Sequence, residues 1–432
     1  MKSSTKIALA LVALMGYAHA DVLTLSEAYN LALANSKNIK ASEYHLESNR
    51  QRIDQAKAEL YPQVYLSGAY GKKEYGSNGF GKIANYGLSL NQSIYNPALN
   101  SKIDIETSKV ALSSSEVELK KQELSQIVLP IYLNILKAQN KVELYNAYGF
   151  ANERKLQLLQ IKFDMALSNR MDLLQGEVDY HFSKMDLRKE KRLIRVNQLK
   201  LKHLLGTSDF QLPTIDFDRV TDETVRQMKE AIAGSDPFLV NLKIEQAKMR
   251  LNLSSKEIKS ASNGHLPNVS LNAQYAEIDA DASVSSLENT KSLMLQIQIP
   301  LYQGGIVESR ITASKLAYRA VQEELLQIED EIKEEYDERL ALFDSASSAL
   351  RLYKEALNSA QLYLDSVSLA FDKGLKSSID MNDAKNKLYE VKYRYVENIY
   401  EMISAYVGLL ILTNSLENLE IVDSIITQKS FQ

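Results

Sequence analysis

Two acidic residues in a polar break between long helical patterns are the side chains whose spacing most suggests chemistry. In the stretch FDKGLKSSIDMND, Asp380 and Asp383 lie three residues apart, so a helix would place both carboxylates on one face. Gly374 suits the position just beyond a helix end, and Ser378 suits the cap of the next helix. Carboxylates near a helix start also complement the helix dipole, and spacing alone favours that structural role.

The remaining titratable side chains form no catalytic or metal-binding pattern. Beyond the N-terminal segment the histidines are scattered without ligand spacing, and each is assigned to the surface or to packing: His45, His181, His203 and His265. The chain has no cysteine, no GxSxG stretch and no phosphate-binding loop. We therefore predict a protein that is not an enzyme and that carries no metal or cofactor.

The N-terminus indicates export. Lys2 and Lys6 precede an apolar run, and the stretch AHA provides a cleavage site, so residues 1–20 are predicted to be a signal peptide. The alternative is a buried N-terminal helix. No later apolar run is long enough to span a membrane as a helix, and disulfides are excluded. The net charge is −4 with both signs mixed, and no basic face indicates nucleic-acid binding.

The mature chain repeats itself. LYPQVYLSGAY (60–70) matches HLPNVSLNAQY (265–275) at an offset of 205, and FDMALSNRMD (163–172) matches FDKGLKSSID (371–380) at an offset of 208. Between them, YGLSLNQSIYNP matches LMLQIQIPLYQG at an offset of 207. Such a small drift indicates a tandem duplication with few insertions.

Each half has the same predicted order: a helical stretch, two strands, and long helices. The predicted organisation is the signal peptide at 1–20, a first structural repeat at 21–205, a linker or equatorial segment at 206–234, a second structural repeat at 235–413 and a C-terminal equatorial segment at 414–432. The predicted strands lie near 64–74, 86–95, 268–278 and 291–301, and the predicted helices cover 26–58, 100–166 and on to about 205, 237–262, 306–372 and 378–412.

The long helices have coiled-coil periodicity. Leu388, Tyr395, Met402 and Leu409 are seven residues apart, and a sustained sevenfold repeat indicates helices packed side by side along their length. A helix of about 65 residues is roughly 100 Å long, far more than a globular domain needs. Pro130 falls inside one such helix, where we expect a kink or bulge.

The four strands alternate between apolar and polar residues. In the last strand, one face carries Leu293, Leu295, Ile297 and Ile299. The other face is wet and nearly uncharged, and with the preceding strand it carries Gln296, Gln298, Ser270, Asn272 and Gln274. One interpretation is an antiparallel sheet packed on a globular core. The length of the strands and of the helices beside them instead favours a membrane barrel with the first set facing lipid and the second a water-filled lumen, and four strands per chain require several chains to close it.

This architecture resembles the TolC family of outer-membrane efflux and secretion ducts, over nearly the whole mature chain. LTLSEAYNLALANSKNI is similar to the family's opening helix and AGSDPF to its second copy; IPLYQGG and FDKGLKSSIDMND are similar to its strand-to-helix turn and periplasmic tip. The resemblance implies an α+β membrane protein of the Gram-negative outer membrane. Its twelve-stranded β-barrel would be formed by a homotrimer and continued by a periplasmic α-helical barrel. Members of the family function with a periplasmic adaptor and an inner-membrane pump, which are separate proteins.

The resemblance also implies roles for the tip residues at 371–383. Asp380 and Asp383 match the paired aspartates that ring the family's channel constriction. Lys376 matches its basic tip residue and Asp172 the acidic residue of the neighbouring coil, a pair that we call the tip latch. The alternative for this pair is a solvent-exposed contact worth less than about 1 kcal/mol. The first copy departs from the family, because Ala166 replaces the tip glycine.

The predicted function is therefore a passive exit duct for a tripartite efflux pump or a type I secretion system. The alternative is a periplasmic coiled-coil structural protein with a small β domain. A porin that acts without partner proteins is disfavoured, because the long helices would then have no function. The sequence leaves the cargo open between drugs, metals, peptides and a secreted protein.

Overall fold

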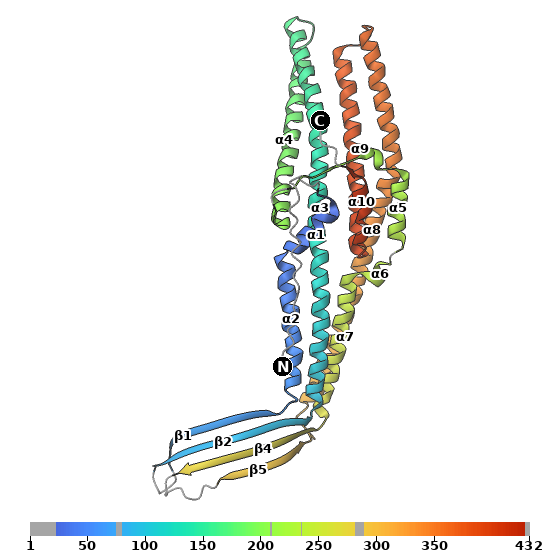
Figure 1. Ribbon diagram of the computed structural model, residues 1–432. Coiled ribbons are helices and arrows are strands. Elements are labelled where there is room, and N and C mark those ends of the chain that lie inside the picture. The colour runs from blue at the N-terminus through green and yellow to red at the C-terminus, as the bar shows by residue number, and fades with distance from the viewer. Residues whose placement is uncertain (1–22, 75–79, 208–209, 235, 281–288, 428–432) are drawn as a thin grey trace, which may run out of the picture.

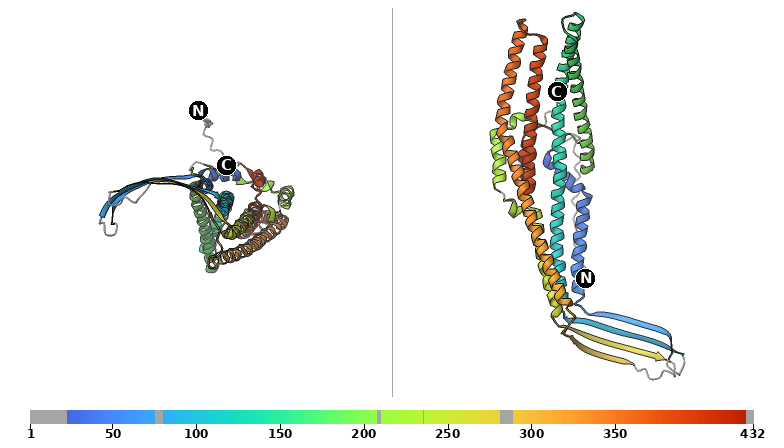
Figure 2. Two further views of the ribbon diagram at one scale, coloured as in Figure 1. Left: turned by 90° about the horizontal axis from the view of Figure 1, so that it is seen from below. Right: turned by 180° about the vertical axis from the view of Figure 1, so that it is seen from behind.

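The computed structural model describes residues 23–74, 80–207, 210–234, 236–280 and 289–427, so the predicted signal peptide lies outside the described residues. The molecule is long and narrow: two helical hairpins stand side by side, and a four-stranded sheet projects from the end opposite their tips (Figure 1). Seen along the bundle, the sheet sweeps sideways as a curved blade (Figure 2).

The two hairpins correspond to the two halves of the duplicated sequence. The first consists of α3 (Pro97–Asp164) and α4 (Arg170–Leu205), and the second of α8 (Ile306–Asp372) and α9 (Ser378–Leu412). α3 packs along α9 and joins the hairpins. The residues at the predicted heptad positions of α9 are all buried, because the apolar stripe that they form faces the neighbouring helices. α3 continues through Pro130 without a break, and the bend expected there stays a prediction.

Shorter helices flank the half of each hairpin nearest the sheet. The sequence predicted one helix over 26–58, but the structure has two, α1 (Leu25–Asn35) and α2 (Lys37–Ala58). The helix is interrupted because Ser36 adopts an extended conformation and its hydroxyl accepts from the backbone N–H of Ile39. In the second half, α6 (Pro237–Val240) and α7 (Leu242–Ser262) take the corresponding places.

The sheet is antiparallel throughout, in the order β1-β2-β4-β5, which leaves β1 and β5 at its edges. The bounds are β1 Gln63–Glu74, β2 Phe80–Tyr95, β4 Asn268–Ala280 and β5 Thr290–Gln298. β2 therefore starts earlier than predicted. β5 ends at Gln298, so Ile299, expected within the strand, follows it. Pro300 has no backbone N–H to donate to a ladder, consistent with the early end of β5.

The linker and the C-terminal segment meet around the middle of the bundle. The linker contains β3 (Thr214–Ile215) and α5 (Asp222–Ala233), and β3 pairs with β6 (Ile426–Thr427) beyond α10 (Glu420–Ser424). The main core lies at this level, where the second half of α9 is almost completely buried and packs mainly against α3 and α8. Within the described ranges, no helix is both long and apolar enough to cross a membrane.

Candidate functional site

The hairpin tips are closed by two turns with the same hydrogen bonds. In the first, the N–H of Ala166 donates to Phe163 O (2.9 Å) and that of Leu167 to Lys162 O (2.7 Å). In the second, Gly374 donates to Phe371 O (2.9 Å) and Leu375 to Ala370 O (2.8 Å). This is the Schellman pattern of helix ends, whose central residue adopts a left-handed conformation. Gly374 suits it with φ 75°, and Ala166 takes φ 59° although it carries a Cβ.

Asp380 lies in the first turn of α9 and closes its cap. Its carboxylate accepts from the backbone N–H and the hydroxyl of Ser377, both at 2.8 Å, while the Ser377 hydroxyl accepts from the N–H of Asp380. The predicted cap, Ser378, is instead the first helical residue, because only Ser377 stands three residues before an acidic partner. The hydrogen bonds from Ser377 and the Lys376 ammonium hold the pKa of Asp380 below its usual value.

Asp383 lies one turn further along α9 and bridges to the other hairpin. Its carboxylate is 2.8 Å from the ammonium of Lys155 on α3, which also lies 3.6 Å from Asp179 of α4. The Lys155 side chain is only 14% exposed, whereas that of Asp383 is 55% exposed. Burial alone would lower the pKa of Lys155, but the hydrogen bonds and charges of Asp383 and Asp179 outweigh it and raise the pKa.

The predicted tip latch is not formed within one chain. Lys376 is 3.4 Å from Asp380 of its own turn, and the Asp172 carboxylate accepts from the Ser168 hydroxyl at 3.2 Å. Among the described residues no ion pair joins Lys376 to Asp172. The latch therefore stays a prediction.

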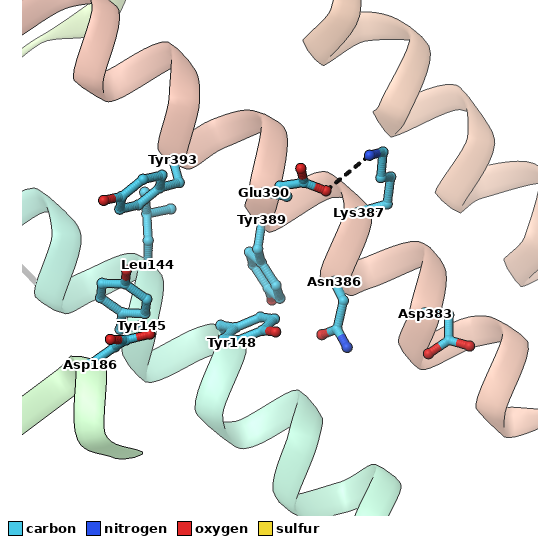
Figure 3. A pocket seen from close by; sticks show the side chains of 10 residues that line it. All are labelled: Leu144, Tyr145, Tyr148, Asp186, Asp383, Asn386, Lys387, Tyr389, Glu390 and Tyr393. Carbon is cyan, nitrogen blue, oxygen red and sulfur yellow. Dashed lines mark hydrogen bonds and ion pairs between the residues drawn. The ribbon is translucent and has the colours of Figure 1, made fainter. Parts of the chain in front are cut away.

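Below Asp383, the seam between α3 and α9 is polar and aromatic. Next to the Lys155–Asp383 pair, the Asn386 amide donates to Asn152 at 2.9 Å. Tyr148 meets Tyr389 edge to face, and Figure 3 shows these two rings facing each other across the seam. A cavity of about 450 Å³ opens beside them. We call this stretch of the α3–α9 contact, from Lys155–Asp383 toward the core, the tip seam.

Sequence reasoning missed Lys155 and the rest of the tip seam. A signal was available, because Ala151, Lys155 and Leu159 are four residues apart on one face of α3. Ala151 and Leu159 are buried. A lysine in such an inward-facing row needs a counter-ion. Which carboxylate serves as the counter-ion depends on how α3, α4 and α9 pack together. The spacing of residues within one helix does not predict that packing.

The strand pairing separates the predicted side-chain sets onto opposite faces of the sheet. Leu293 and Leu295 are registered with Ala273 and Leu271, and Ile297 with Val269. Gln296 is registered with Ser270, and the Asn272 amide donates to Gln296 at 3.2 Å; Gln274 is registered with Ser292 and Gln298 with Asn268. Leu293, Leu295 and Ile297 are 72%, 61% and 60% exposed, and no described residue of the four strands is buried.

An apolar sheet face without a core against it has to meet lipid or another chain. Together with two hairpins about 100 Å long, this defines a subunit of an outer-membrane channel with a long helical extension. The family model described as outer membrane efflux protein matches residues 28–207 and 239–415. The chain belongs to this family.

Relatives and solved structures agree with this assignment. The outer membrane protein TolC of Vibrio cholerae is 21% identical and covers 92% of either chain. The alkaline protease secretion protein AprF of Pseudomonas aeruginosa is 22% identical over 90% of this chain and 84% of AprF. The crystal structure of VceC, an outer membrane protein of Vibrio cholerae, has a TM-score of 0.75 at 16% identity, covering 90% of this chain and 96% of VceC.

The predicted resemblance, outer-membrane location and duct function are thereby confirmed. The protein is an outer-membrane channel for efflux or secretion, and its family consists of channel proteins.

Proposed function

We propose that three copies of this chain form one passive exit duct. The sheet carries this proposal, because β1 and β5 leave backbone donors and acceptors unpaired among the described residues. Hydrocarbon does not tolerate such edges, and four strands are too few to close a membrane barrel. Three copies of four strands give twelve, and pairing β5 of one copy with β1 of the next removes every edge. The apolar set led by Leu293, Leu295 and Ile297 then meets lipid, and Gln296 and Gln298 meet water.

The long hairpins would continue the barrel as a tunnel through the periplasm. A duct without an energy source of its own needs an inner-membrane pump and a periplasmic adaptor, and we propose these as partners. The names of the relatives point to two kinds of cargo: AprF is a protease secretion protein, and TtgC of Pseudomonas putida is a probable efflux pump outer membrane protein. We propose efflux or type I secretion for this chain without choosing between them.

The tips would form the gate. Three copies bring three Asp380 and three Asp383 carboxylates to the hairpin ends around one axis. Rings of carboxylates attract cations, and a multivalent cation can bridge several of them. Asp380 also serves its own helix cap, so the structural role favoured by spacing and the gate role coexist at this residue.

The main alternative is a structural coiled-coil protein with a small β domain. It leaves the apolar face of the sheet exposed to water and both edges unpaired, which soluble sheets avoid.

Two measurements on the purified protein test the duct. A sample in mild detergent should migrate in SDS electrophoresis as a trimer without heating and as a monomer after boiling. The same sample added to a planar lipid bilayer should produce discrete conductance steps. A monomer that gives no conductance steps would overturn the proposal in favour of the structural protein.

A further inference from the structure

A single lysine connects the two hairpins at the level of the candidate gate. Lys155 of α3 contacts Asp383 of α9 at 2.8 Å and Asp179 of α4 at 3.6 Å. Its two carboxylate partners therefore belong to different hairpins: Asp179 to the same hairpin as Lys155, and Asp383 to the other. No other described lysine or arginine bridges carboxylates of two further helices in this way near the tips.

We propose that Lys155 is a releasable counter-ion of the gate. While the hairpins are together, it neutralises Asp383 and holds α9 against α3. When they separate, Asp383 is set free and the ring at the constriction becomes more negative. The proposal rests on the proposed duct, and it adds a residue that sets both the closure of the gate and its selectivity for ions.

The unequal burial of the three side chains makes the contact releasable. Lys155 is 14% exposed, and a lysine that buried is costly to leave without a counter-ion. Asp179, 28% exposed, stays beside it when α9 moves away, so Lys155 keeps one partner. Asp383 is 55% exposed and passes into water at little cost. Breaking this bridge therefore strands no buried charge.

The contact between α3 and α9 beside Lys155 is also weak. Next to it, Asn386 donates to Asn152, but the second amide atom of each side chain, Asn152 Nδ2 and Asn386 Oδ1, is buried without a partner in the described structure. Buried amide atoms without partners weaken a contact, since each gains a hydrogen bond once water enters. The opposite end of α9 is apolar and fully buried, with Ile403, Tyr406 and Leu409 at 0% exposure. The seam therefore opens at the tip while the core stays closed.

Single-channel recordings in planar bilayers test the proposal. Lys155→Met should raise the conductance of the closed-state channel. It should also lower the trivalent-cation concentration that gives half-maximal block from the tip side by about fivefold, because Asp383 is left uncompensated. Lys387→Met is the matched control: Lys387 is on α9, one turn from Asp383, and pairs within its own helix with Glu390 at 2.9 Å. It removes the same charge from beside Asp383 without breaking the bridge, so it should leave the closed-state conductance close to wild type and change the block less than Lys155→Met does.

A second variant should act in the opposite direction. Asp179→Asn removes the partner that Lys155 keeps on opening, so separation would strand a buried charge and the closed state should gain stability. Its conductance should therefore fall below that of wild type, which no simple damage to the tip predicts. Electrophoresis without heating verifies that each variant is a trimer, and if Lys155→Met does not assemble, Asp179→Asn alone decides.

Two outcomes would overturn this inference: Lys155→Met behaving like Lys387→Met, or Asp179→Asn raising the conductance. Failure of the duct itself looks different, because the wild-type protein would then give no channels at all. Failure of the carboxylate gate is separate again, because block would survive removal of Asp380 and Asp383.

Discussion

At the scale of single residues, the start of α1 is capped both by side chains next to it in the sequence and by a side chain far from it in the sequence. The first N–H groups of a helix have no partner within it. Thr24 and Glu27 form the capping box expected from their spacing. The N–H groups of Leu25 and Ser26 donate instead to Asp423 of α10, at 2.8 and 3.3 Å. The C-terminal segment is thereby fixed to the first helix.

Asp423→Ala should destabilise the folded protein by about 2 kcal/mol, because it removes hydrogen bonds to a charged acceptor and leaves helix donors unsatisfied. Thermal unfolding followed by circular dichroism measures the loss. Glu420→Ala is the control, since Glu420 is exposed on the same short helix. Equal melting temperatures for the two variants would show that the contact contributes nothing.

The tip turns offer a pair of substitutions with opposite expected signs. Ala166 adopts φ 59°, which costs a residue with a Cβ about 1 kcal/mol relative to glycine. Ala166→Gly should therefore stabilise the first hairpin by up to about 1 kcal/mol. Gly374→Ala should destabilise the second by about as much, since a Cβ there meets no atom and only the backbone conformation resists it.

Hydrogen exchange at the two tips, compared with wild type, measures both effects in one protein. Slower exchange after Gly374→Ala would contradict the assignment of strain to the left-handed conformation.

Residue-level prediction from the sequence was accurate where the signal is local. The Thr24–Glu27 box can be recognised from the three-residue spacing of a threonine and a glutamate alone. The cap of α9 was placed one residue late because Ser377 and Ser378 are adjacent, and only the spacing to Asp380 distinguishes them. The partners of Asp423 and Lys155 could not be predicted, because they lie on other helices and, for Asp423, almost at the other end of the chain.

At the scale of elements, the alternation of apolar and polar residues predicted which side chains share a face of the sheet better than it predicted where each strand begins and ends. The apolar and polar sets of β5 fall on opposite faces, and their partners in β4 match them. The early start of β2 depends on its pairing with the far end of β1, where Glu74 is registered with Phe80. Alternation in one strand carries no information on where its neighbour continues.

Arginine substitutions on the two faces of β5 should have unequal effects. Leu295→Arg or Ile297→Arg would place a charge in lipid, at a cost of about 2–4 kcal/mol near the bilayer midplane. Gln296→Arg and Gln298→Arg add the same side chain on the wet face and should be tolerated. The yield of heat-modifiable trimer in membrane fractions compares the four variants. Similar losses on both faces would contradict the assignment of lipid and lumen.

The helices followed their heptads closely, and α8 and α9 have the predicted bounds. The exceptions are the break at Ser36 and the break at Asn241, where the predicted helix 237–262 divides into α6 and α7. Gly206, at the end of α4, lies so close that an added Cβ would meet the Asn35 side chain at 2.6 Å, and the Asn35 amide donates to Leu204 O at 3.2 Å. α1 therefore ends where it is anchored to α4, a tertiary contact that the helical pattern of 26–58 does not reveal.

At the scale of the whole molecule, the duplication explains the two hairpins but not the position of the core. That position depends on segments outside the repeats. β3 and β6 come from the linker and from the C-terminal segment, and with α5 and α10 they lie beside the middle of the bundle. These segments have no long periodic pattern, so the sequence predicted only a linker and a C-terminal segment, without the helices and strands that they contain.

Trivalent-cation block is the prediction that belongs to the assembled duct. Converting both Asp380 and Asp383 to Ala in every copy should abolish most of the block from the tip side and weaken cation selectivity, because the ring loses its charge. Trimer assembly should be retained, since neither side chain is buried: that of Asp380 is 40% exposed and that of Asp383 is 55% exposed. Bilayer recordings with a trivalent cation compare the variant with wild type. Unchanged block would place the gate elsewhere and leave the aspartates as helix caps and bridges.

The two free edges of the sheet also set the kinetics of assembly. In the proposed trimer, β1 and β5 of one chain are satisfied only by other copies, so we expect the sheet to enter the membrane only after it has met them. Encounter between subunits is concentration-dependent. The rate of channel formation should therefore rise more steeply than in proportion to the amount of newly exported chain. A cell that halves its synthesis of this protein would lose more than half of its rate of channel formation.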